Sequence, residues 1–328
     1  MASLHGRTVR VAGAGALGLA VAIEAARAGA TVSVHDPAPG DNASAVAAGM
    51  LAPVYEAVLD PVSAGHFPLL MAARDAWPAF AERTGVMLDR SGALYSGARA
   101  LAVRAALARL GMAGEARSGG LFTAEDWRIE ARPALDRLRQ TARDLGVSFR
   151  MDPVQSAEAG TDTIAATGWR PVDWAPESSV ISPIKGQILR LSGHPPLDGP
   201  VARRDGGYIA PSRGGAIYGA TMEPGRSDLA ADEAIDTLVD HLHPAWRTVG
   251  AMARVEVGVR GASPDGLPLV GPSRAPGVWL AMGARRNGWL MAPLVAGMMR
   301  AYLAGEDAGP WAPMMDARRF AAPDGTED

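Results

Sequence analysis

The sequence contains no cysteine and only one lysine, Lys185. Without a thiol there can be no disulfide, no thiolate nucleophile and no cysteine-ligated metal site. The six histidines also lack a metal-ligand spacing: His241 and His243 are two residues apart, which on a helix directs them to different faces. We therefore expect no metal. The near absence of lysine, with arginine in its place, is typical of a GC-rich genome.

Long apolar runs and blocks of like charge are missing as well. Hydrophobic residues make up 48% of the 328 residues and charged residues 20%, with a net charge of −3 spread along the chain. This balance is that of a soluble globular protein and argues against a nucleic-acid partner. The apolar run from Gly288 to Met299 is too short to cross a bilayer, and the first residues lack a signal-peptide core. We expect a cytoplasmic protein without a transmembrane segment; whether it forms a homo-oligomer stays open.

A β-α-β pattern opens the chain. Thr8 to Ala12 and Thr31 to His35 have the composition of strands, and the Ala-rich segment Ala16 to Ala28 between them has helical periodicity. From Ile184 onward, short β-like runs alternate with Gly and Pro turns, which indicates a more antiparallel sheet. The pattern also predicts one small-residue helix over 44–51, one long helix over 61–83, a loop over 111–120 and an apolar helix over 288–303.

The first strand and helix are joined by GAGALG, which carries Gly13, Gly15 and Gly18. The first glycine permits a tight turn, the second lets backbone amides approach a pyrophosphate, and the third lets helix and strand pack closely. The helix start, Ala16 and Leu17, then presents N–H groups to the phosphates.

Asp36 follows the second strand, where a carboxylate can accept hydrogen bonds from ribose hydroxyls. The motif predicts dinucleotide binding but does not separate FAD from NAD.

The run NASAVAAGMLAP, Asn42 to Pro53, with Glu56 beyond it, resembles the D-amino-acid oxidase and glycine oxidase superfamily, most closely the glycine oxidases of thiamine biosynthesis. Matching segments follow in the family's order: DTIAATG (162–168), PIKGQ (183–187), YIAPSRGGAIYGAT (208–221), GVRGASPDGLPLVGPS (258–273) and MGARRNGWLMAP (282–293). The resemblance implies an FAD cofactor. It also implies an α/β fold with a Rossmann-like FAD-binding domain, residues 1–85, 125–175 and 252–328, interleaved with an α+β substrate domain, residues 86–124 and 176–251.

Carried over position by position, the resemblance assigns cofactor contacts along the whole chain. Ser44 would contact phosphate, Val154 would lie against adenine, and the remaining positions would lie along the flavin or close over the cofactor: Ala48, Gly49, Met50, Leu51, Thr167, Gly168, Gly283, Asn287, Gly288 and Leu290. The helix that starts near Gly288 would direct its N-terminus at the flavin pyrimidine ring, where its dipole favours the negative charge of reduction.

The resemblance also implies the reaction, the oxidative deamination of a small amino acid or amine such as glycine, sarcosine or a small D-amino acid. Arg260 is the candidate that grips the substrate carboxylate with two parallel hydrogen bonds. Tyr208 would add a hydroxyl, and Arg286 would lie in the loop over the flavin. No general base is nominated. Molecular oxygen, or another electron acceptor, would complete the cycle.

Several positions depart from the glycine-oxidase pattern. Gly261 stands where proline is usual, Ala284 where histidine is common, Arg285 where an aromatic is usual, and Ser212 interrupts a Pro-Arg pair, so that Arg213 comes one place late. Gly206 also replaces a polar residue. These departures weaken the assignment of glycine more than that of FAD.

Other functions stay open at this point. The chain could be an FAD-dependent dehydrogenase that passes electrons to a quinone or carrier protein, an NAD(P)-binding enzyme, or a flavoprotein whose substrate pocket has decayed. Arg260 could be a structural arginine and Tyr208 an ordinary strand tyrosine.

Overall fold

The computed structural model describes residues 3–117, 119–192, 199–241 and 252–320. The chain forms two compact units, each made of segments that are distant in the sequence. Unit 1 comprises Met1–Asn42, Leu135–Pro183 and Arg260–Asp328, and unit 2 comprises Ala43–Ala134 and Ile184–Val259.

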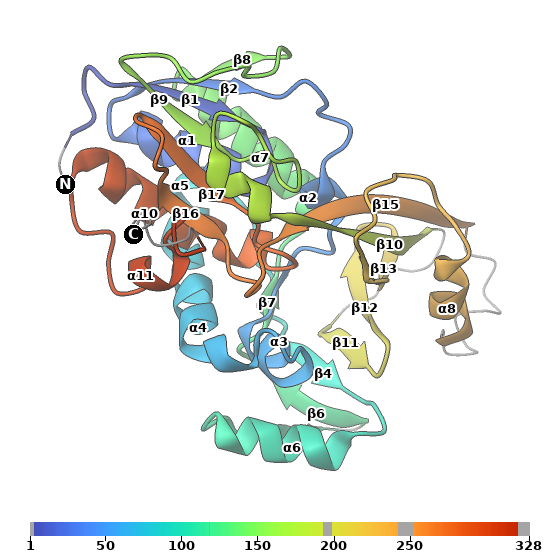
Figure 1. The fold of residues 1–328 in the computed structure, drawn as a ribbon. Helices are drawn as coiled ribbons and strands as arrows, with labels where there is room; N and C mark the ends of the chain where they lie inside the picture. Colours follow the sequence, from blue (N-terminus) through green and yellow to red (C-terminus); the bar gives the residue numbers. More distant parts are fainter. Residues whose placement is uncertain (1–2, 118, 193–198, 242–251, 321–328) are drawn as a thin grey trace, which may run out of the picture. The chain divides into compact units, whose positions relative to one another are not determined.

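Unit 1 is built on a six-stranded sheet (Figure 1). Its strands, in spatial order, are β16 (Leu269–Pro272), β17 (Val278–Met282), β9 (Thr161–Ala165), β1 (Thr8–Ala12), β2 (Thr31–His35) and β8 (Ser148–Arg150). All pairs are parallel except β16 with β17. The predicted β-α-β start is therefore confirmed, with β1 at the centre of the sheet between β2 and β9.

Two apolar helices pack together against this sheet. Helix α1 (Ala16–Arg27) buries most of its small residues, and it contacts β1, β2 and α10 (Gly288–Ala304). The predicted helix over 288–303 is confirmed. Unit 1 also holds η2 (Pro176–Val180), α11 (Ala312–Met315) and most of α7 (Ala131–Asp144).

Polar contacts link three adjacent inner strands of unit 1. Arg7 donates two hydrogen bonds of 2.8 Å to the Asp162 carboxylate and a third to the Leu303 carbonyl at the end of α10. The Trp279 indole donates to the same carboxylate at 2.9 Å. One carboxylate thus links the strand starts of β1, β9 and β17.

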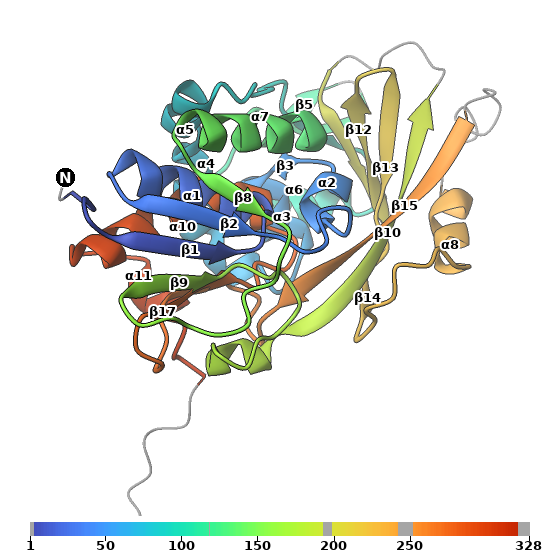
Figure 2. The ribbon, with the colours of Figure 1, turned by 90° about the horizontal axis from the view of Figure 1, so that it is seen from above.

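Unit 2 carries the longer sheet, whose strands from β14 to β5 pair antiparallel except β11 with β4 (Figure 2). Its strands, in order, are β14 (Glu223–Pro224), β10 (Ser182–Ser192), β13 (Gly215–Gly219), β12 (Gly207–Ser212), β11 (Val201–Arg204), β4 (Ala93–Tyr95), β6 (Gly120–Thr123) and β5 (Glu115–Arg117), and β15 (Met252–Ala262) also pairs β10. A short second sheet pairs β3 (Met50–Leu51) with β7 (Trp127–Arg128).

Helices cover the apolar core of unit 2. They are α2 (Ala43–Val46), α3 (Pro53–Leu59), η1 (Ala64–His66), α4 (Phe67–Asp75), α5 (Trp77–Thr84), α6 (Ala100–Arg109) and α8 (Ala234–His241). The core joins Tyr55 of α3, Leu107 of α6 and the strand residues Tyr95, Tyr208 and Ile217.

Three predicted elements are corrected. The expected helix over 44–51 ends at Val46, and Met50–Leu51 form a strand instead, because Gly49 turns the chain at φ +76°. The expected helix over 61–83 is divided into η1, α4 and α5. Pro68 lies in the first turn of α4 and Pro78 in the first turn of α5, where a proline needs no N–H donor. The expected loop over 111–120 contains the edge strand β5.

The predicted fold class, α/β with a mostly antiparallel second sheet, is confirmed. The predicted boundaries between a cofactor domain and a substrate domain stay a prediction, because the two units are defined by compactness and not by bound ligands.

Helix α6 offers a matched test of the unit 2 core. Leu107 is 1% exposed and Leu101 is 85% exposed on the same helix. We expect Leu107→Ala to lower the free energy of unfolding by about 2–5 kcal/mol, through lost burial and a residual cavity. Leu101→Ala should change it by less than about 0.5 kcal/mol. Urea denaturation followed by circular dichroism measures both, and equal effects would contradict the packing described.

Candidate functional site

The turn between β1 and α1 requires two glycines. A Cβ at Gly13 or Gly18 would lie less than 3.0 Å from a backbone carbonyl oxygen, that of Ala166 or of Gly13 respectively, and Gly13 has φ +113°. Gly15 is the N-cap of α1, which begins with Ala16 and Leu17 and has no acidic residue in its first turn. The first N–H groups of a helix have no partner within the helix, and they favour an anion. The turn therefore fits a pyrophosphate.

Asp36 lies beside this turn. Its carboxylate accepts hydrogen bonds from the Ala14 N–H at 3.3 Å and the Ala38 N–H at 3.1 Å. The Asn42 side chain donates to the Ala14 carbonyl at 3.1 Å. The acid is thus held next to the phosphate turn, as ribose recognition requires.

Further predicted cofactor residues of unit 1 lie in the segments that follow its strands. Thr167 and Gly168 follow β9 after Ala166, and the Thr167 hydroxyl donates to the Arg170 carbonyl at 2.5 Å. Val154, predicted to contact adenine, accepts a hydrogen bond of 3.1 Å from the Trp174 indole. Gly283 follows β17 at φ +80°.

The segment before α10 pairs with the end of β15. An antiparallel bridge joins Ala262 to Ala284, and the Arg285 N–H donates to the Gly261 carbonyl at 2.8 Å. Beyond this bridge the chain turns, because the Asn287 N–H donates to the Ala284 carbonyl at 2.8 Å. Arg286 therefore lies in the turn that follows the bridge, and Arg260 lies two residues before the bridge in β15. The structure thus brings two of the predicted substrate residues, both partly buried, to one pair of neighbouring segments.

The loop ends at the start of α10. Asn287 is the N-cap, and Gly288 and Leu290 lie in the first turn, which contains no acidic residue. The helix start is therefore suited to a neighbouring negative charge.

Two departures from the family pattern belong to this loop. Gly261 approaches Gly168 so closely that a Cβ there would lie less than 3.0 Å from the Gly168 carbonyl and from Ile181. Arg285 has φ +50°, a conformation that L residues rarely adopt. The chain therefore has no room for a proline ring at position 261.

The predicted flavin residues of unit 2 surround the α2–β3 turn. Ser44 lies in α2, Ala48 is 4% exposed, and a Cβ on Gly49 would lie less than 3.0 Å from the Ile129 carbonyl. Met50 and Leu51 pair with Arg128 and Trp127.

Tyr208 lies in β12, in the apolar core of unit 2, and is 7% exposed. Its ring centroid is 6.0 Å from the Arg203 guanidinium carbon. Tyr208 and the arginines of the C-terminal loop belong to different units. Their joint grip on a carboxylate therefore stays a prediction.

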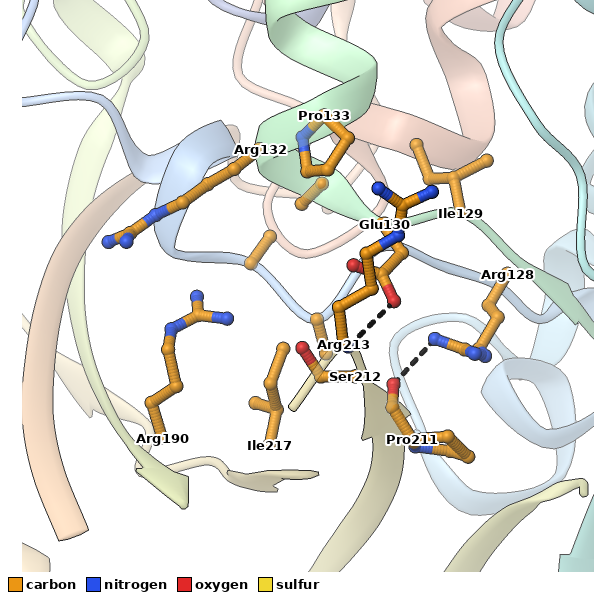
Figure 3. Close-up of a pocket in the computed structure, with 13 residues that line it drawn as sticks. Arg128, Ile129, Glu130, Arg132, Pro133, Arg190, Pro211, Ser212, Arg213 and Ile217 are labelled. Carbon is orange, nitrogen blue, oxygen red and sulfur yellow. Dashed lines mark hydrogen bonds between the residues drawn. The ribbon is translucent and has the colours of Figure 1, made fainter. Parts of the chain in front are cut away.

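Sequence reasoning missed a cavity in unit 2, of about 180 Å³ (Figure 3). Ala47 and Ala48 form part of its wall, and four arginines line it: Arg128, Arg132, Arg190 and Arg213. These arginines come from β7, α7, β10 and the β12–β13 turn, so no local motif reveals them. In the sequence analysis, the one departure that concerned an arginine of this cavity was Arg213, which comes one place later than in the family pattern.

A buried charge cluster lies elsewhere in unit 2. The Asp126 carboxylate accepts the N–H groups of Val54 at 2.8 Å and Tyr55 at 3.1 Å, at the start of α3. Arg203 and Glu56, both buried, form an ion pair of 3.2 Å. Burial raises the pKa of Asp126 to about 6, although Arg203 and the two N–H groups act in the opposite direction.

The parts of the chain that the structure describes contain neither of two further kinds of feature, a metal-binding cluster and a membrane-spanning helix. Residues 3–117, 119–192, 199–241 and 252–320 contain no cluster of three metal-ligating side chains. Within the same ranges, no helix has the length and apolarity needed to span a membrane.

The glycine turn, the acid after β2 and the parallel sheet define a nucleotide-binding α/β protein. The sequence profile of the DAO family, described as FAD dependent oxidoreductase, matches residues 8–302. The chain belongs to this family, and its cofactor is FAD. The predicted family, the enzyme class and the cofactor are therefore confirmed.

The chain is similar to several proteins whose names are known. A bifunctional ThiO/ThiG protein of a Nostoc species is 29% identical over 89% of this chain and 52% of its own length, so the chain spans about half of that relative. Glycine oxidase of Geobacillus kaustophilus has a TM-score of 0.80 at 22% identity, covering 96% of this chain and 100% of that one. Iminodiacetate oxidase of a Chelativorans species has a TM-score of 0.79 at 20% identity, covering 94% and 98%. The two structures show the same fold.

The turn glycines can be tested against a glycine in open space. We expect Gly18→Ala to reduce bound FAD at least about tenfold, because the added methyl displaces the turn that meets the pyrophosphate. Gly40→Ala, where nothing lies within 4 Å, is the control and should retain FAD as the wild type does. The ratio of flavin to protein absorbance after purification measures both. Full FAD content in Gly18→Ala would contradict this account.

The raised pKa of Asp126 predicts a stability change with pH. The unfolded carboxyl has a pKa of about 3.9, so the folded state binds the proton more tightly. The free energy of unfolding should therefore fall by about 3 kcal/mol as pH rises from about 4 through about 6. Urea denaturation across this range measures it.

Asp126→Asn should remove this part of the pH dependence. Asp136→Asn, at an exposed carboxylate of α7, should keep it. If the free energy of unfolding falls with pH as steeply in Asp126→Asn as in the wild type, another titratable group causes the pH dependence.

Proposed function

We propose that the chain oxidises the C–N bond of a small amino acid or of an amine that carries a carboxylate, such as glycine, sarcosine or a small D-amino acid. The observation that supports this most directly is the bridge between Ala262 and Ala284, which joins the strand that carries Arg260 to the turn that carries Arg286 at the start of α10. Because the chain belongs to the DAO family of FAD-dependent oxidoreductases, FAD is the redox cofactor of the proposed reaction. The names of the relatives, glycine oxidase and iminodiacetate oxidase, agree with this substrate class.

Arg260 would bind the substrate carboxylate. Its guanidinium is planar and can donate two parallel hydrogen bonds, which fixes both the position and the rotation of the bound acid. Arg286, in the facing segment, would add a second cation to the same region. Orientation of the Cα–H bond is the main contribution required of the protein.

When bound, FAD would supply the two-electron acceptor for the hydride that leaves the substrate carbon, and the residues around the α10 start would hold its flavin ring. The substrate binds with a neutral amine, so its nitrogen lone pair can form the C=N bond as the C–H bond breaks. Water then hydrolyses the imine to an oxo acid and ammonia, or a primary amine where the donor was N-methylated. Oxygen takes up the two electrons with two protons as hydrogen peroxide. No side-chain base is needed.

The absorbance of the FAD-loaded protein tests this proposal. Under anaerobic conditions, we expect glycine, sarcosine or D-alanine to bleach the flavin band, and admission of air to restore it with release of peroxide. A band that bleaches but recovers only with a dye or quinone would instead indicate a dehydrogenase. A band unchanged by every amine in the panel would reject the proposal.

Arg260→Met tests the carboxylate grip on the same protein. We expect the substrate concentration for half-maximal flavin reduction to rise about 10- to 100-fold, because a charge-assisted hydrogen bond contributes about 1.5–3 kcal/mol. Arg254→Met is a control on the same strand, at a side chain that is 77% exposed, and should leave this concentration unchanged. Equal effects of the two changes would exclude Arg260 from substrate binding.

A further inference from the structure

Apart from Ala48, a predicted flavin contact, the residues that line the arginine-lined cavity of unit 2 have no role in the proposed reaction. Its walls come from the end of α2, the segment that enters α7, strand β10 and the β12–β13 hairpin. Figure 3 shows Arg132 and Arg190 on one side of the cavity, and Arg128 and Arg213 on the other. Apolar atoms of Ala48, Ile129 and Ile217 complete the lining.

The cations of the cavity outnumber the acids that they meet. Arg132 donates to Glu256 at 2.8 Å, and Arg190 donates to the same carboxylate at 3.0 and 3.1 Å. Arg254, which does not line the cavity and is 77% exposed, approaches it only to 4.0 Å. Arg132 and Arg190 thus share one buried carboxylate, and one positive charge of the cavity is not neutralised by it.

The opposite side of the cavity does not show this imbalance. Arg128 pairs with Asp89 at 2.7 Å and donates to the Pro211 carbonyl. The Glu130 carboxylate accepts the backbone N–H of Arg213 at 3.0 Å. Asp89 and Glu130 thus offset Arg128 and Arg213, and the excess of positive charge comes from the arginines around Glu256.

The contacts also hold the guanidinium groups in place. Each guanidinium has five N–H donors, and the hydrogen bonds to Glu256 use one of Arg132 and two of Arg190. Helix α7 starts at the cavity wall, where the Ala134 N–H bonds to the Glu130 carbonyl, so the positive end of its dipole adds to the field.

We propose that this cavity binds a small oxyanion, a carboxylate or phosphate group. Its volume of about 180 Å³ is below the range of about 300–1,000 Å³ typical of drug-sized ligands, and large enough for one such group with its water. Oriented guanidinium donors match the oxygens of both groups. The anion is either free in solution or an acidic group of the amine substrate, and only the second source rests on the proposed function.

Calorimetric titration of the FAD-loaded protein with inorganic phosphate, at constant ionic strength, tests the site. We expect saturable binding in the wild type and binding at least about tenfold weaker in Arg132→Gln and Arg190→Gln. Arg137→Gln, at an exposed arginine of α7 that does not line the cavity, is the matched control and should bind as the wild type does. No saturable heat with phosphate or with succinate, or equal binding by all four proteins, overturns the proposal.

Flavin reduction by the amine then distinguishes the two sources. If phosphate and succinate raise the KM of the amine without changing kcat, the site receives an acidic group of the substrate. If they bind without changing KM, it receives a free anion. Because the heat of phosphate binding does not depend on flavin reduction, an inactive protein would still give a decisive titration.

Discussion

The close backbone approach at the β1–α1 turn is the constraint on which unit 1 depends. Gly13 lies against the Ala166 carbonyl, and Gly18 lies against Gly13 itself, so one turn fixes the spacing of β1, α1 and the end of β9. The Gly13 N–H donates to His35 and the Ala166 N–H to Ala12, which adds β2 to the same junction. Side chains larger than hydrogen would separate these elements before any nucleotide could bind.

A second close approach accounts for departures that the sequence alone leaves unexplained. In the glycine-oxidase pattern a proline is usual at the position of Gly261, so the glycine makes the backbone less rigid. An aromatic residue is usual at the position of Arg285, so the arginine adds a charge. In the structure, the backbone at Gly261 packs directly on Gly168 and accepts the Arg285 N–H, and Arg285 adopts φ +50°. The two changed positions therefore contact each other through the backbone, one at the end of β15 and the other in the turn before α10. A decayed pocket does not follow from them.

Local patterns predicted the parts of the structure that depend on local chemistry. The strand, glycine turn, helix and acid of 8–36 are adjacent in the chain, and α10 is an uninterrupted apolar helix, so both could be predicted. The division of 61–83 accompanies the prolines in the first turns of α4 and α5, and the end of α2 depends on the contact of Gly49 with Ile129, 80 residues away. The arginine-lined cavity draws on four separate elements, so its residues share no spacing in the sequence.

Glu256 shows why such a cavity is energetically reasonable in a folded protein. Four arginines without any acid would repel one another, and Arg128 and Arg190, which are partly buried, would be costly to bury. A buried carboxylate that accepts hydrogen bonds from Arg132 and Arg190 reduces this cost and fixes their direction. Because this carboxylate carries one charge and the two cavity arginines bound to it carry two, part of the attraction stays available to a second anion. The same residue thus stabilises the arginines and leaves them able to bind.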